Sequence, residues 1–217
     1  MIMMDDEVRC WAVVIADQRV SRRGPDRVPE AIQALVPLAG GFRLGFERTA
    51  GDEIQALSAD PDTVMKAIVT LWRLGDWHLG VGVGEVETPL PDSTRAARGP
   101  AYLAARQAIG RPGGTGPRLA GGPGTPSLRA LDEAQTVLAL VAALIRRRSA
   151  AGWQVIDLVD AGLTQTQAAR RLGVSPQAVG QRLRAAHHQE VTAGLELATA
   201  RLAEAMGVSV APSTVAP

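Results

Sequence analysis

Apolar residues in the first half of the chain form short runs separated by a helical pattern. The run CWAVVIA at 10–16 is continuous and β-branched, which predicts a buried strand. A helix is expected over 29–38, with Pro29 in its first turn. Segments 42–49 and 54–57 flank the short turn AGDE and predict a hairpin. The pattern therefore begins with the order β-α-β-β.

The same periodicity continues to residue 109. A helix capped by Asp60 or Asp62 is predicted to run to about Leu74. Residues 77–86 alternate apolar with small side chains, which indicates another strand, and 100–109 predict a short helix. The resulting order β-α-β-β-α-β is the split ferredoxin-like pattern, so the expected fold class is α+β.

Glycine and proline dominate residues 110–127, GRPGGTGPRLAGGPGTPS, and no apolar period survives there. Such a stretch buries too little surface to offset its ordering entropy, so we interpret it as a linker or a long loop. It divides the chain into an α+β domain over 1–109 and a helical segment over 128–210.

The second segment has only helical periodicity. Residues 127–148 place their apolar positions on one broad face, and 153–159 predict a short helix that Gly162 ends. A last helix is expected over 187–206. Two alternatives remain open for it: pairing with a second copy to form a homodimer, or packing on its own domain.

Between these helices, residues 163–186 read LTQTQAARRLGVSPQAVGQRLRAA and predict a helix-turn-helix. Thr164 is a good N-cap, with Gln167 three residues later as in a capping box. Gly173 marks the turn, where the small Val174 side chain fills the corner. The alternative is a helical hairpin that only packs.

The second helix of this motif has the pattern that DNA reading needs. Ser175 is its N-cap, Pro176 occupies the first helical position, and Val179 and Leu183 face inward. Short polar side chains then face a DNA groove, where Gln reads adenine and Arg reads guanine or binds phosphate. The DNA-binding candidates are Thr164, Ser175, Gln177, Ala178, Gln181, Arg182 and Arg184.

Composition narrows the function classes. The net charge of +1 does not by itself favour nucleic acid, so local charge must carry that argument. Cys10 is the only cysteine, which excludes a disulfide within one chain and a cysteine-based zinc site. The N-terminus carries acids where a signal peptide needs bases, and the longest apolar stretch, 136–145, is too short for a bilayer. We expect a cytoplasmic protein without a membrane partner.

Carboxylates follow two of the predicted strands. Asp17 ends the first strand, and Asp52 and Glu53 occupy the hairpin turn. Oxygen ligands in this arrangement suit Mg²⁺, which in turn binds nucleotide phosphates. Backbone N–H groups just after Asp17, at Gln18, could bind those phosphates through hydrogen bonds. The guanidinium groups of Arg19, Arg22 and Arg23 could neutralise their charge. Alternatively, the acids serve only turn chemistry and loop capping.

The pairing of Asp17 with the sequence AGDEI resembles the nucleotide cyclase superfamily, both class III cyclases and GGDEF domains. The resemblance implies that Asp17 and Asp52 bind metal, with Glu53 as an extra ligand, and that Arg106 contacts the triphosphate. The family's Asn position falls at Tyr102 or a neighbour, so the catalytic set is incomplete. The nucleotide-binding candidates are Asp17, Gln18, Arg19, Arg22, Asp52, Glu53 and Arg106.

The whole chain is similar to the SatD-like family. The motifs are Asp17 followed by Ser21-Arg22, then GDE at 51–53, GVGVGE at 80–85 and GPA at 99–101, ahead of a helix-turn-helix that resembles those of sigma factors. The resemblance implies a bacterial transcription regulator whose cyclase-like domain senses GTP, ATP or a cyclic dinucleotide with Mg²⁺. The alternatives are an active metal-dependent nucleotide cyclase with an accessory helix-turn-helix, and a constitutive repressor whose first domain only dimerises.

Overall fold

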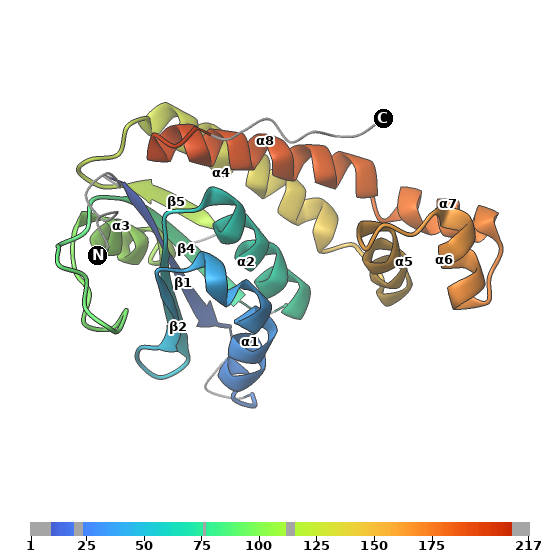
Figure 1. Ribbon diagram of the computed structural model, residues 1–217, viewed down its shortest axis with the longest axis horizontal. Helices are drawn as coiled ribbons and strands as arrows, with labels where there is room; N and C mark the ends of the chain where they lie inside the picture. Colours follow the sequence, from blue (N-terminus) through green and yellow to red (C-terminus); the bar gives the residue numbers. More distant parts are fainter. Residues whose placement is uncertain (1–9, 20–23, 76, 112–115, 210–217) are drawn as a thin grey trace, which may run out of the picture.

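A five-stranded sheet forms the centre of the protein, in a computed structural model that describes residues 10–19, 24–75, 77–111 and 116–209 (Figure 1). Strand β1 lies in the middle, antiparallel to β3 and β4, and the strand order is β2-β3-β1-β4-β5. The strands are β1 Trp11–Gln18, β2 Leu44–Arg48, β3 Glu53–Ser58, β4 Trp77–Gly84 and β5 Arg118–Gly121.

The predicted α+β class is confirmed, and the first four strands alternate with helices in the predicted order β-α-β-β-α-β. The helices are α1 Val28–Leu35, which continues into the 3₁₀ segment Val36–Gly41, α2 Pro61–Leu74, α3 Pro100–Ile109, α4 Leu128–Ile145, α5 Ala150–Asp160, α6 Gln165–Leu172, α7 Pro176–Ala185 and α8 His188–Met206.

Strand β5 corrects the interpretation of 110–127 as a linker or loop. Residues 118–121 pair with β4 in parallel. Leu119 and Ala120 are both buried, on opposite faces of the sheet, and the backbone N–H of Leu119 donates to Gln135 Oε1 at 2.8 Å. The surrounding glycines and prolines hid this strand, because four residues are too few to show a period of their own.

Helices cover both faces of the sheet. Along β1, the side chains of Ala12, Val14 and Ala16 lie in the main core with α1, α2, α4 and α8, while Trp11 and Ile15 face α3. This alternation is the period of two that a strand buried on both faces must satisfy.

Helix α3 lies directly on the backbone of β4. A Cβ atom added at Gly82 would sit 2.1 Å from the carbonyl oxygen of Ala101, and one at Gly80 would sit 2.7 Å from Ile109. The GVGVG run therefore serves close helix-to-strand packing.

The long helices α4 and α8 pack side by side and also against the sheet (Figure 1). Leu131 and Leu138 of α4 and Leu202 and Met206 of α8 lie in the same apolar cluster as β1 and β4. The sequence pattern groups both helices with the helix-turn-helix. Instead most of their buried surface completes the sheet's core, because α1 and α2 leave part of that face uncovered.

Helices α5, α6 and α7 form a unit at the far end of α4 and α8 (Figure 1). The unit has its own small core, centred on Val155, Ala168 and Val179. Within the described part of the chain, no helix is long and apolar enough to cross a membrane.

Candidate DNA-binding surface and carboxylate cluster

Local hydrogen bonds shape the first half of the helix-turn-helix as the sequence predicts. The backbone N–H of Gln167 donates to Thr164 Oγ1 at 3.3 Å, and that of Thr164 donates to Gln167 Oε1 at 2.8 Å. This capping box starts α6, and Gly173 ends it in the left-handed conformation, with φ of 66°.

Helix α7, the second helix of the motif, is equally well defined at its start. Ser175 Oγ accepts a hydrogen bond from the backbone N–H of Ala178 at 3.1 Å, and Pro176 occupies the first turn. Val179 is fully buried and Leu183 is 9 % exposed, so the inward face is occupied by the unit's own core. The opposite side of α7 carries the exposed residues Gln177, Gln181 and Arg184.

The predicted DNA-binding residues of α6 and α7 are all at least partly accessible to solvent. Thr164, Ser175, Gln177, Gln181 and Arg184 are exposed, and Ala178 and Arg182 are half-buried. Two further residues that the sequence analysis does not single out, Arg170 and Arg171 on α6, are also exposed.

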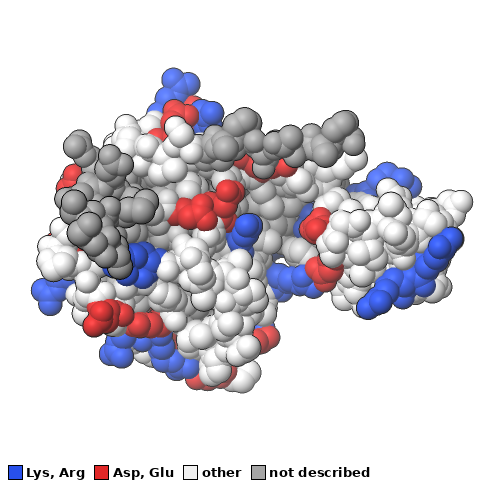
Figure 2. Space-filling view, viewed as in Figure 1, with Lys and Arg blue, Asp and Glu red and all other residues white. Residues whose placement is uncertain are grey.

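The sequence does carry a signal for these two arginines, because residues 161–189 contain four arginines and no acid. Figure 2 shows basic side chains along the outer edge of this unit and acidic ones on its side towards the sheet. Two acids of α5 already have basic neighbours: Asp157 pairs with Arg73, and Asp160 lies 3.4 Å from His188. The outer edge is thus positive, although the whole chain is nearly neutral.

The predicted carboxylates of the sheet domain do come together. Asp17 and Glu53 are opposite one another in the pairing of β1 with β3, so their side chains share a face. Burial raises the pKa of Asp17, and the charges of Asp52 and Glu53, with a hydrogen bond to Asp52, raise it further. Asp17 and Asp52 therefore form a carboxylate pair in which like charges repel.

Glu53 and Arg106 neutralise one another beside that pair. Both guanidinium Nη atoms of Arg106 bond to the Glu53 carboxylate, and the hydroxyl of Thr49 donates to the same carboxylate. The hydrogen bond from Arg106 to Glu53 also raises the pKa of the arginine. Arg106, which the resemblance assigned to a triphosphate, thus already has a partner.

Tyr102, at the family's Asn position, is buried on the same face of the sheet. Its hydroxyl lies 3.3 Å from Thr94 Oγ1, in the segment that follows β4, and burial raises its pKa. The side chain therefore packs the segment between β4 and α3 against the sheet.

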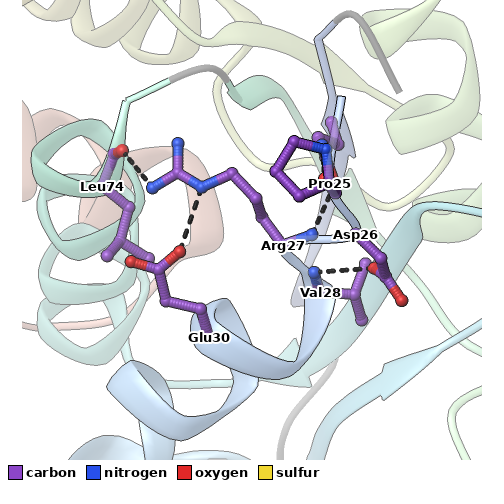
Figure 3. A network of polar contacts seen from close by, with 7 residues as sticks. Pro25, Asp26, Arg27, Val28, Glu30 and Leu74 are labelled. Atoms are coloured by element: carbon purple, nitrogen blue, oxygen red, sulfur yellow. Dashed lines mark hydrogen bonds and ion pairs between the residues drawn. The ribbon is translucent and has the colours of Figure 1, made fainter. Parts of the chain in front are cut away.

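The other nucleotide candidates lie elsewhere. The Gln18 side chain donates to the carbonyl of Pro25 at 2.8 Å and accepts from the backbone N–H of Arg27 at 2.9 Å. Figure 3 shows that Arg27 also bonds to Glu30 and to the carbonyl of Leu74. Gln18 therefore fixes the start of α1 to the sheet.

Arg19 lines a separate cavity near α2, and Arg22 lies outside the described residues. Among the residues that the structure describes, no group of three or more His, Cys, Asp or Glu side chains could hold a metal ion. The available hard ligands are the two carboxylates of Asp17 and Asp52, because Glu53 is bound to Arg106.

Comparison with known proteins adds little. No protein-family model matches the chain, and no curated protein matches it in sequence. The chain is similar to the crystal structure of a regulator of polyketide synthase expression from Bifidobacterium adolescentis, at 14 % identity over 88 % of this chain and 79 % of that one, with a TM-score of 0.28. A likeness that low carries no argument, so any function must be argued from the residues.

Proposed function

We propose that this protein is a transcription regulator that binds duplex DNA through helix α7. The observation that carries the proposal is the exposed polar edge of α7, presented on an acid-free surface while the opposite edge is buried in the unit's own core. Any amphipathic hairpin leaves one side exposed, so it is the polar and basic character of this side, in a segment without an acid, that favours DNA.

The docking follows from the positions of the side chains. Ser175, Gln177 and Gln181 lie along the exposed side of α7 and can reach base edges in the major groove. Arg170 and Arg171 on α6 are placed to contact the phosphate backbone beside that groove. The N-terminus of α6, capped by Thr164, offers N–H groups to a further phosphate.

The salt dependence of binding tests this proposal. Selection from a random duplex library should yield a preferred site, and its affinity should fall with added salt. If the four arginines of residues 161–189 each meet a phosphate in both copies of a dimer, the slope of log K against log salt approaches about −7. Purified protein that ignores duplex DNA at about 50 mM salt contradicts the proposal.

The outer side of α4 and α8 is the surface that we propose for a homodimer. Most of the apolar face of α8 is occupied within its own chain, yet Leu197 is 50 % exposed beside Val137 in a groove of about 640 Å³. The groove's charged residues balance, and both of its arginines, Arg129 and Arg201, pair with Glu133 of the same chain, so neither arginine would enter a twofold interface without an acidic partner. A second copy also doubles the DNA contacts.

Leu197→Arg should convert the dimer to a monomer, because it replaces an apolar side chain that the second copy would bury with a longer, charged one. Light scattering should report twice the 22.8 kDa chain mass for the unmodified protein and the chain mass for the variant. The matched control is Leu103→Arg on α3, which is 73 % exposed and lies away from this groove. A monomeric unmodified protein, or equal masses for both variants, would exclude this interface.

We further propose that Asp17 and Asp52 bind the cation of a magnesium–purine nucleotide, which makes the sheet domain a sensor. Burial is the main reason that the pKa of Asp17 is raised, and a cation would relieve the repulsion from Asp52 and Glu53 that raises it further. The antiparallel order β2-β3-β1-β4 supports a ferredoxin-like, cyclase-type sheet. The pairing of Arg106 and the burial of Tyr102 favour a sensor over an active cyclase.

Asp52→Ala should remove the response to nucleotide while leaving DNA affinity unchanged, because Asp52 lies in the β-hairpin and not in the helix-turn-helix. The measurement is the shift in melting temperature with Mg²⁺ and GTP, ATP or a cyclic dinucleotide, since a ligand of the folded state raises it. Equal shifts for the variant and the unmodified protein would rule out the sensor site.

A further inference from the structure

A cavity of about 290 Å³ lies where the sheet domain meets the helix-turn-helix unit. Its wall comes from the end of α2, the start of β4, the end of α4 and the first turns of α5. Four arginines and three tryptophans supply most of the lining, and among the described residues no acid lines it. Positive charge and flat aromatic surface are therefore combined in one partly open space.

Three hydrogen-bond donors in this wall have no partner among the described residues. They are Nε1 of Trp77, Nε of Arg19 and Nη2 of Arg148, and each of these atoms is shielded from solvent. Trp77 as a whole is only 5 % exposed. Buried donors almost always find acceptors in native proteins, because an unmet one costs free energy. Three buried donors that could each give a hydrogen bond to an acceptor therefore belong to residues of one cavity wall.

The wall also connects the two parts of the molecule. The guanidinium carbons of Arg73 and Arg148 lie 4.9 and 4.7 Å from the centroid of the Trp153 ring on α5. Arg73 forms a bidentate ion pair with Asp157 on α5, and Arg148 Nε donates to the carbonyl of Ala186 at 2.9 Å. A molecule in the cavity would touch groups that hold α5 and the end of α7.

We propose that this cavity binds a small aromatic acid, one ring carrying a phosphate or a carboxylate. The anionic group accepts hydrogen bonds from Arg19, Arg148 and the indole N–H of Trp77. The ring lies against Leu71 and Trp72, because the Trp153 ring is already covered by arginine side chains. The volume equals that of about ten water molecules in the liquid, which suits one ring and one anionic group.

Ligand binding in this cavity does not depend on the proposed function. Only the effect of the ligand on DNA binding rests on that function. Because the ligand touches both the sheet domain and α5, its binding favours one placement of the helix-turn-helix over others. The ligand then changes DNA affinity by some factor, and DNA changes ligand affinity by the same factor.

Tryptophan fluorescence and calorimetry on the full chain test the site, since three of the four tryptophans line the cavity. The probes are phenyl phosphate and phenylacetate, which distinguish a phosphate from a carboxylate, with inorganic phosphate and neutral benzyl alcohol as half-ligands. We expect saturable binding of one acid and at least tenfold weaker binding of both half-ligands.

Arg19→Gln and Trp77→Phe should each weaken that acid about tenfold or more, because each removes a donor to a charged group. The matched control is Arg147→Gln, an exposed arginine on the same segment as Arg148 that does not line the cavity, and it should bind normally. Unchanged melting temperatures establish that the variants fold. If a variant does not fold, the unmodified protein is titrated with the acid instead, and the chemical shifts of its indole N–H signals report whether Trp77 is contacted.

Three results would overturn the proposal: no saturable binding of either acid, equal affinity for benzyl alcohol, or unchanged affinity in Arg19→Gln. Measuring DNA binding on the same protein distinguishes failure of the proposed function from failure of the cavity site. Protein that binds the acid but no DNA refutes the proposed function and leaves the cavity site intact, whereas DNA binding without any acid binding does the reverse.

Discussion

Replacing Arg184 with alanine should weaken binding of the preferred DNA site by about 1 to 3 kcal/mol for each copy of α7, or roughly 5- to 150-fold. Arg184 is exposed, and no ion pair involves it among the described residues, so its guanidinium is available to a base or a phosphate. The measurement is fluorescence anisotropy with a labelled duplex at two salt concentrations. If Arg184 binds a phosphate, the steepness of the salt dependence should also fall by about one for each copy of the arginine that is replaced.

Arg147→Ala is the control for that experiment, because it removes the same charge from an exposed position between α4 and α5. Both variants should melt at the temperature of the unmodified protein, since neither side chain holds the fold together. An equal fall in DNA affinity in the two variants would show that only net charge matters, and α7 would not be the reading helix.

The second large effect is on stability. Gly82→Ala should destabilise the protein by about 3 kcal/mol or more, because the added methyl group overlaps backbone atoms of α3 and has no flexible neighbour to displace. The new carbon would lie 2.1 Å from the oxygen of Ala101 and 2.2 Å from the nitrogen of Ala105. Helix α3 must then move away from β4, which opens the core around both elements.

Denaturation by urea measures this destabilisation as a fall in the midpoint concentration. Gly45→Ala on β2 is the matched control, because a carbon added there meets nothing within 4 Å, and it should change stability by less than about 0.5 kcal/mol. Similar midpoints for the two variants would mean that α3 packs more loosely on β4 than the structure shows.

The parts of the helix-turn-helix that sequence could predict depend on interactions between near neighbours. The capping box of Thr164 with Gln167 spans three residues, and so does the bond from Ala178 to Ser175. Gly173 ends α6 by its own conformational freedom. Such signals are visible in a linear pattern because each needs only a few adjacent positions.

The candidate carboxylate site was predictable only in part. Strand ends and the hairpin turn indicated that Asp17 and Asp52 would lie together. The ion pair between Glu53 and Arg106, residues separated by 53 positions, depends on how α3 crosses the sheet. Likewise, Gln18 looked like a phosphate ligand, yet its amide bonds to the backbone at 25 and 27.

By itself the sequence determined the type and limits of most elements, the α+β class and the helix-turn-helix, because short-range hydrogen bonds and apolar periods set these. Only the tertiary structure decided that α4 and α8 complete the core of the sheet, that residues 118–121 extend it, and that Arg19, Trp77 and Arg148 surround one cavity. Those outcomes depend on which helix or strand packs on which face of the sheet. Contacts between residues far apart in the chain determine that packing.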